Sequence, residues 1–249
     1  RWKGEATGAG AVLEASLPGV AGVNDLSCYC FNRENIKSAD ARLTIGAAGS
    51  RLEAGVTRLV VIGVNHYGDP RWNLRYAISD AELFAGEMTT RQRGLAEVSR
   101  VDVTRLEDAD ATRANILSAL ERLGQAEPED TVIVYYAGHG TARDARYFLL
   151  PHDFSVSPEG ELLNVISDTE LEEAFERVNA AHVLFVLDSC NSGQVLDSDE
   201  RRRGPMNTRG LAQLAYEKGM FVLAASQGYQ AANEARDLGH GFLTYSLVK

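Results

Sequence analysis

Two residues with the chemistry of a base and a nucleophile each follow an apolar run. Residues 131–137 lead into His139, which has a glycine on either side, and residues 182–187 lead into Cys190. In an open parallel sheet, the carboxyl ends of the strands face the crevice in which ligands bind. If the two runs form neighbouring parallel strands, the imidazole can take the thiol proton and leave a reactive thiolate.

The residues around this pair favour the same chemistry. Gly138 and Gly140 would let the backbone turn sharply and approach a substrate closely. We expect the amides of Gly140 and Cys190 to form an oxyanion hole for a tetrahedral intermediate. Cys190 or His139 alone would be read as a structural residue, so it is the pair with these flanks that indicates catalysis.

Two motifs carry a resemblance to a known family. Residues 135–140 (YYAGHG) and 187–193 (LDSCNSG) resemble the active-site motifs of the caspase and metacaspase superfamily. The His-to-Cys interval of about 50 residues is also that of caspases. The similarity runs from about Arg58 to the C-terminus and includes residues 74–81 (LRYAISDA) and 241–244 (GFLT).

The resemblance implies an α/β fold with a mainly parallel six-stranded sheet and helices on both faces. It also implies a Cys190–His139 dyad that cleaves peptide bonds through a thioester, without a cofactor. The alternative is a catalytically silent scaffold that keeps the fold for interaction. The presence of His139, Cys190 and two acids described next favours the enzyme.

Specificity is predicted from Asp80 and Asp188. Aspartate-cutting caspases carry Gln where this chain has Asp188, and their first arginine corresponds to Leu74 here. Metacaspases and bacterial relatives similarly have an acid at each of the positions of Asp80 and Asp188. Two carboxylates in one pocket would select Arg or Lys by charge-assisted hydrogen bonds. The alternatives are a solvated helix-face acid for Asp80 and a turn-forming residue for Asp188.

Three further expectations concern the segments around the motifs. The resemblance places Ser226 beside the substrate, after a strand at 220–225. Residues 197–204 (DSDERRRG) fall where large and small subunits of the family are separated, so we expect self-cleavage there, unless the segment is only a solvated linker. The candidate cleavage sites are Arg201, Arg202 and Arg203.

The sequence predicts no metal site. Calcium takes six to eight oxygen ligands, and the segment after His139 offers only Asp144 and Asp153. Asn191 stands where many metacaspases have His after the cysteine. Both features indicate a bacterial-type branch of the family without calcium activation.

The elements that must position these residues alternate between strand and helix from Arg58 onward. Fully apolar strands between amphipathic helices are typical of a parallel sheet covered on both faces. The predicted strands are 58–64, 101–103, 131–137, 182–187 and 220–225. The predicted helices are 76–88, 112–123, one that a capping box opens at Ser167, 210–218, and one from Gly241.

Two domains are expected. Residues 1–55 have the short β-prone runs of part of an immunoglobulin-like module, and residues 56–249 form the peptidase domain. Within the latter, we expect a large-subunit part to about residue 200, a linker at about 196–208 and a small-subunit part at 209–249. Cys28 and Cys30 lack metal or redox spacing and are read as small buried hydrophobes.

Composition narrows the partners. The chain has 249 residues, of which 45% are apolar and 24% charged, as in soluble globular proteins. Its longest apolar runs have strand length, which argues against a membrane helix, and a net charge of −10 disfavours nucleic acid. We expect protein or peptide substrates with basic residues, and a sensor or regulatory protein or domain. Three cysteines fit a reducing compartment, so the expected location is cytoplasmic.

Overall fold

The computed structural model describes most of the chain after residue 53 and part of the chain before it. The described residues are 22–30, 36–47, 54–143, 146–191, 219–225 and 240–248, with positions 12, 14, 32, 215, 234 and 235. The chain consists of two compact units, Arg1–Ala54 and Gly55–Lys249.

The first unit contains a two-stranded antiparallel sheet of β1 (Gly22–Cys28) and β2 (Ala41–Ala47). Cys28 and Cys30 are both exposed, so the expectation that they are buried is wrong. The reason is that the described part of this unit has a single layer, and a lone two-stranded sheet has no core in which to bury a thiol. Its relation to an immunoglobulin-like module stays a prediction.

The second unit is built on a seven-stranded sheet. Five strands run parallel in the order β11-β10-β5-β3-β4, and β6 and β9 extend β5 in antiparallel fashion. The strands are β3 (Gly55–Gly63), β4 (Val98–Glu107), β5 (Thr131–Arg143), β6 (Arg146–Leu150), β9 (Ile166–Ser167), β10 (His182–Asn191) and β11 (Phe221–Ala224). The sheet is therefore mainly parallel, as expected.

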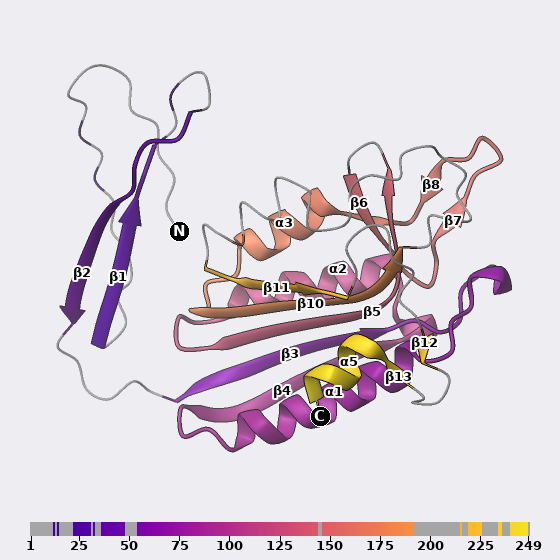
Figure 1. Ribbon diagram of the computed structural model, residues 1–249, viewed down its shortest axis with the longest axis horizontal. Coiled ribbons are helices and arrows are strands. Elements are labelled where there is room, and N and C mark those ends of the chain that lie inside the picture. The colour runs from indigo at the N-terminus through magenta and orange to yellow at the C-terminus, as the bar shows by residue number, and fades with distance from the viewer. Residues whose placement is uncertain are drawn as a thin grey trace. The chain divides into compact units, whose positions relative to one another are not determined.

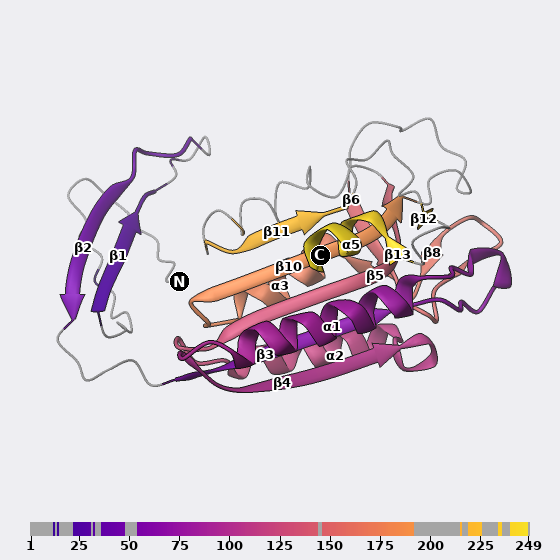
Figure 2. The same cartoon turned by 60° about the horizontal axis from the view of Figure 1, so that its bottom comes forward.

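Helices cover both faces of this sheet (Figures 1 and 2). One face carries α1 (Ala77–Arg93) and α5 (Phe242–Val248), and the other carries α2 (Arg113–Arg122) and α3 (Asp168–Glu176). The predicted fold class is confirmed. In the described part of the chain the sheet has seven strands and not six, because β6 and β9 join the five parallel ones.

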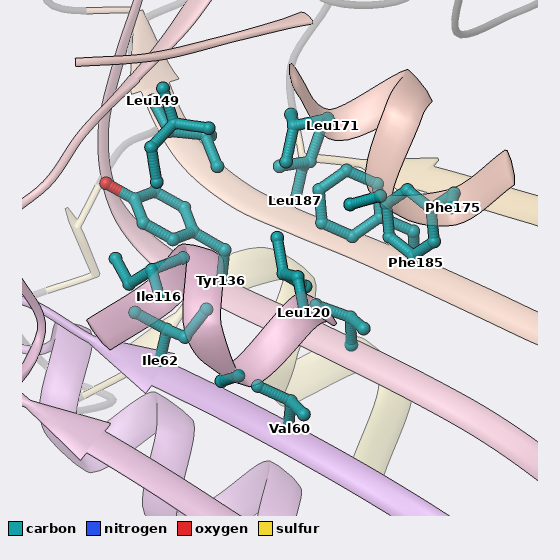
Figure 3. Packing of buried hydrophobic residues seen from close by; sticks show 14 of the residues in the cluster. Val60, Ile62, Ile116, Leu120, Tyr136, Leu149, Leu171, Phe175, Phe185 and Leu187 are labelled. Carbon is teal, nitrogen blue, oxygen red and sulfur yellow. The ribbon is translucent and has the colours of Figure 1, made fainter. Parts of the chain in front are cut away.

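Alternation along the strands produces two cores. Phe185 of β10 points to the α2 and α3 side, where its ring lies 5.0 Å from that of Phe175 of α3 (Figure 3). Tyr135 of β5 points to the other side, where it stacks on Phe84 of α1 at 4.4 Å. This alternation fixes which sheet face each residue near the ends of β5 and β10 approaches.

The helix boundaries follow local signals. Thr112 caps α2, and Ser167 opens α3 with the predicted capping box, in which Glu170 reaches back to the Ser167 amide. Short ladders join β7 (Ser155–Val156) to β8 (Leu162–Leu163) and β12 (Glu234–Ala235) to β13 (His240–Gly241). Of the predicted helix at 210–218, only Ala215 is described, and it is helical. None of the described helices combines the length and hydrophobicity that crossing a membrane requires.

Candidate active site

His139 and Cys190 are neighbours across the sheet. β5 and β10 pair in parallel without a shift from His182 opposite Thr131 to Asn191 opposite Gly140, so Cys190 is the register partner of His139. Neighbouring strands lie about 4.8 Å apart. The structure describes only the backbone of Cys190. The backbones of the two predicted site residues lie side by side on neighbouring strands.

Both residues lie inside strands and do not follow them. The expected strand ends at Ala137 and Leu187 are wrong, because β5 continues to Arg143 by pairing with β6, and β10 continues to Asn191 beside it. The expectation that glycines make a sharp turn around His139 is also wrong. They make room for tyrosine hydroxyls, since a Cβ on Gly140 would lie 1.9 Å from Oη of Tyr147.

The hydrogen bonds of the His139 ring define which nitrogen carries a proton. Nε2 lies 2.8 Å from the backbone oxygen of Trp72. Because a carbonyl oxygen can only accept, Nε2 holds the ring proton and Nδ1 keeps its lone pair. Nδ1 is buried and has no hydrogen-bond partner among the described residues. The ring thus offers one unprotonated nitrogen, as a general base requires.

Aromatic rings enclose this imidazole. The ring centroid of Tyr67 lies 5.1 Å from that of His139, and Trp72 meets it edge-on at 5.6 Å. The side chain is 8% exposed. Burial lowers the pKa of His139, and the hydrogen bond to the Trp72 carbonyl opposes that shift. The imidazole is therefore neutral near pH 7 and able to accept a proton.

Asp80 and Asp188 converge on one backbone position. The Gly241 amide donates to both carboxylate oxygens of Asp80 at 3.0 Å. A Cβ built on Gly241 would lie 3.0 Å from Oδ2 of Asp80 and 3.2 Å from Oδ2 of Asp188. The two acids thus meet around Gly241, although they come from α1 and β10, and neither is a solvated surface residue or part of a turn.

Hydroxyl groups hold the Asp188 carboxylate. Oδ2 accepts hydrogen bonds from Oγ1 of Thr244 at 2.6 Å and from Oη of Tyr135 at 3.1 Å, and these two hydroxyls are 2.6 Å apart. Burial raises the pKa of Asp188, and the donors Thr244 and Tyr135 counteract part of the shift. Burial, and after it the negative charge of Asp188, raises the pKa of Tyr135 well above its usual value.

Four residues of the site had no assigned role in the sequence prediction. Trp72 and Tyr67 contact His139, and Thr244 and Tyr135 contact Asp188. Thr244 and Tyr135 both lie in motifs that carry the family resemblance, which was the available signal. Trp72 contributes a backbone oxygen, and no side-chain type identifies such a role.

Other predicted residues lie outside the described part of the chain. These are Ser226, Arg201, Arg202, Arg203 and Asp144, and the predicted linker at 196–208 is outside it as well. Asp153 accepts a hydrogen bond from the Arg113 amide at 2.8 Å. Within the described residues, no group of three or more His, Cys, Asp or Glu side chains could hold a metal ion.

A parallel sheet covered on both faces, with a histidine and a cysteine in register near the carboxyl ends of its middle strands, defines a caspase-like α/β protein. The sequence agrees, because the family model described as "Caspase domain" (Peptidase_C14) matches residues 57–249. The chain belongs to this family, which lies within the caspase and metacaspase superfamily of cysteine peptidases.

Curated relatives are metacaspases. The chain is 33% identical to "Inactive metacaspase-4" of Trypanosoma brucei brucei over 153 residues, covering 57% of this chain and 42% of that protein. It is 30% identical to "Metacaspase-7" of Arabidopsis thaliana over 165 residues, covering 61% of this chain and 38% of the relative. The chain thus spans about two fifths of the length of these relatives.

A solved structure shares the fold. Protein GSU0716 from Geobacter sulfurreducens superposes with a TM-score of 0.53 at 19% sequence identity, over 77% of this chain and 80% of that chain. At this identity the likeness concerns the architecture alone.

Proposed function

We propose that the chain is a cysteine endopeptidase that cleaves peptide bonds after Arg or Lys, with Cys190 as nucleophile and His139 as base. The observation that carries the proposal is the register pairing of Cys190 with His139, whose buried Nδ1 has a lone pair and no partner among the described residues. Side chains of register partners in parallel strands share a face of the sheet, so a thiol at this position would lie on the same face as the imidazole.

The reaction is an acyl transfer. Nδ1 of His139 accepts the thiol proton, and the thiolate of Cys190 attacks the carbonyl carbon of the peptide bond. The amides of Gly140 and Cys190 donate hydrogen bonds to the oxygen as it becomes negative. His139 then gives its proton to the departing amine, which leaves a thioester on Cys190. Water, deprotonated by His139, hydrolyses the thioester and regenerates the thiol.

Asp80 and Asp188 would recognise the basic side chain before the scissile bond. Their carboxylates converge from two elements on the space beside Gly241. A guanidinium or ammonium group that binds there gains charge-assisted hydrogen bonds from both acids. An aspartate in the same place would meet two like charges, so the site discriminates against it.

The same proposal covers regulation. An enzyme with this specificity can cut itself after Arg201, Arg202 or Arg203, and Ser226 would line the extended substrate. We further propose a bacterial-type, cytoplasmic effector whose activity depends on a sensor or regulatory protein or domain. The support for these parts is the sequence: a run of three arginines that directly follows Asp199 and Glu200, Asn191 after the cysteine, and few cysteines.

A second candidate is a scaffold without catalysis. One curated relative is named as an inactive metacaspase, so membership of the family does not by itself imply activity. The unprotonated Nδ1 of His139 and the paired acids favour the enzyme, because a scaffold has no chemical need for either.

A peptide panel tests the proposal. Wild-type chain and Cys190→Ala are incubated with fluorogenic peptides that differ only in having Arg, Lys or Asp before the scissile bond, and the purified chains are compared by mass spectrometry. We expect hydrolysis after Arg and Lys, and cleavage after Arg201, Arg202 or Arg203, both abolished by Cys190→Ala. Hydrolysis after Asp alone would overturn the specificity, and no cleavage of any kind would favour the scaffold.

A further inference from the structure

One loop supplies the hydrogen-bond partners of the His139 ring and of the His139 amide. Residues 64–76 connect β3 to α1, and this loop supplies both the Trp72 carbonyl that holds Nε2 and the Tyr67 hydroxyl that accepts from the His139 amide at 2.8 Å. The rings of Tyr67 and Trp72 also pack on Phe154, at 5.5 and 5.1 Å. The orientation of the base therefore depends on where this loop is held.

Asp108 holds the start of the loop. It lies just after β4, and its Oδ1 accepts hydrogen bonds from the amides of Asn65 and His66, each at 2.8 Å. Its Oδ2 lies 2.6 Å from Nδ1 of the His66 ring. One carboxylate thus fixes two consecutive backbone amides and a side chain directly before Tyr67.

The backbone at Asp108 is in a conformation that is unfavourable for most residues. Its φ is +43°, in the left-handed region, and Asn164 is the other described non-glycine residue with a positive φ. Such conformations persist where surrounding contacts hold them, and they concentrate at functional sites. The hydrogen bonds to residues 65 and 66 keep Asp108 in this conformation, and the conformation aims the carboxylate at the loop.

We propose that Asp108 is a positioning residue for the active site: it anchors the 64–76 loop, and the loop in turn fixes the tautomer and orientation of His139. Asn65 completes the anchor, because its carbonyl accepts from the Leu74 amide at 2.8 Å and so ties the two ends of the loop together. The inference rests on the proposed role of His139 as base. The hydrogen bonds that link Asp108, the loop and His139 are present whether or not His139 acts as a base.

Loss of the Asp108 carboxylate would reach the His139 ring through the 64–76 loop. Without the carboxylate, the amides of Asn65 and His66 lose their acceptor, and the loop can move away from β5. The His139 ring then loses the Trp72 carbonyl, which is what keeps the proton on Nε2 and the lone pair on Nδ1. A base that is free to change tautomer or to rotate is in the reactive state for only part of the time.

The decisive variant is Asp108→Gly, because glycine adopts a positive φ without strain. This substitution removes the carboxylate and relieves the backbone conformation, so a loss of function cannot be attributed to strain introduced at residue 108. Asp108→Asn is the conservative variant: asparagine tolerates the left-handed region, and its side-chain oxygen can accept from the same two amides. Asp102→Ala is the matched control, since Asp102 is an exposed acid on β4 that pairs with Arg100.

The first readout does not require activity. In full chains that all carry Cys190→Ala, ¹⁵N chemical shifts of the His139 ring report which nitrogen is protonated. We expect one Nε2–H tautomer in the parent, in Asp108→Asn and in Asp102→Ala, and a mixture of tautomers in Asp108→Gly. A single Nε2–H tautomer in Asp108→Gly would overturn the proposal, whether or not the chain is a peptidase.

The second readout uses the active chain. We expect Asp108→Gly to lower kcat by about a hundredfold with little change in KM, because the base is misplaced while the binding acids are untouched. Asp108→Asn should recover most of this loss. If Asp108→Gly does not fold, His66→Ala gives a second test, since it removes only the ring contact and should lower kcat by a smaller factor. Unchanged kcat in Asp108→Gly, or in His66→Ala where Asp108→Gly does not fold, would contradict the proposal.

Discussion

The two halves of the candidate site hold buried ionisable groups in opposite ways. His139 is enclosed by aromatic rings and has one hydrogen bond from its ring, to a backbone carbonyl. Asp188 is held by two hydroxyl groups, and Asp80 by a backbone amide that donates to both of its oxygens. Burial favours the neutral form in both halves. In the acid half, hydrogen-bond donors oppose part of this effect on the pKa of Asp188, whereas a single acceptor, the Trp72 carbonyl, opposes it for the pKa of His139.

This difference matches what the proposed function requires of each half. A base has to be neutral before it reacts, so burial and a single acceptor suit His139. An acid that recognises a cation has to be charged, so it needs donors that stabilise the carboxylate. Removing groups from the base half should therefore change kcat, and removing groups from the acid half should change KM and its pH dependence.

The largest effect is expected when the base is removed. His139→Ala should lower kcat/KM on Arg peptides by about a thousandfold, mainly through kcat, because it removes the proposed acceptor of the thiol proton. Peptide binding should change little, because both acids remain. The measurement is steady-state kinetics beside His182→Ala, an exposed histidine at the start of β10 that should have no effect. Equal losses in both variants would mean that the effect is not specific to the base.

The next effect tests the charge of the acid half. Asp188→Asn should lower kcat/KM on Arg peptides by roughly thirtyfold, the equivalent of about 2 kcal/mol for a charge-assisted hydrogen bond. The loss should appear in KM. A peptide with norleucine before the scissile bond serves as the control, because an uncharged side chain should bind the variant and the parent equally.

The same variant has an expected effect on stability. Burial raises the pKa of Asp188 in the folded chain above its unfolded value, so the ionised carboxyl costs the native state free energy at neutral pH. That cost is absent below the unfolded pKa of about 3.9, where the group is protonated in both states. Asp188→Asn should thus raise Tm at pH 7, and the gain should vanish as the pH falls below about 4. A lower Tm at pH 7 would contradict this account.

A smaller effect is expected from filling the space between the acids. Gly241→Ala places a methyl group 3.0 Å from Oδ2 of Asp80 and 3.2 Å from Oδ2 of Asp188. Both contacts are tight, so we expect KM for Arg peptides to rise about tenfold, with a loss of about 1 kcal/mol in the free energy of unfolding. Gly86→Ala on α1 is the control, because a Cβ there meets no atom within 4 Å. A kcat effect without a KM effect would assign Gly241 to the base half instead.

The sequence predicted the parts of this site that follow from local patterns. Apolar runs between amphipathic helices indicated the sheet, and Ser167 with Glu170 indicated where α3 begins. The positions of His139 and Cys190 relative to these runs were enough to place them at one edge. Their pairing required only that the two runs be parallel neighbours, and they are.

The parts that could not be predicted depend on contacts between distant segments. The crowding at Gly140 comes from Tyr147 on β6, so the glycine was read as a turn residue when it sits inside a strand. The proton on Nε2 of His139 is set by the Trp72 backbone, which any residue type could provide. The exposure of Cys28 reflects a single-layer sheet, which an alternating pattern alone does not reveal.

The smallest effect should come from the hydroxyl that stabilises Asp188. Thr244→Val keeps the shape of the side chain but removes the donor 2.6 Å from Oδ2 of Asp188. The pKa of Asp188 should rise further, because the hydrogen bond from the Thr244 hydroxyl, which lowers it, is lost, while the one from Tyr135 remains. We expect a KM about threefold higher for Arg peptides at neutral pH, equivalent to part of one neutral hydrogen bond.

The pH dependence of this variant separates the two halves most sharply. Since the folded pKa of Asp188 rises, the acid limb of kcat/KM for Arg peptides should move to higher pH, and Thr244→Ser should return it to the position seen in the parent. The norleucine peptide should keep its acid limb unchanged, because that substrate depends on His139 and not on the charge of Asp188. If the limb moved equally for both peptides, Thr244 would act on the base, and the division between the two halves of the site would be wrong.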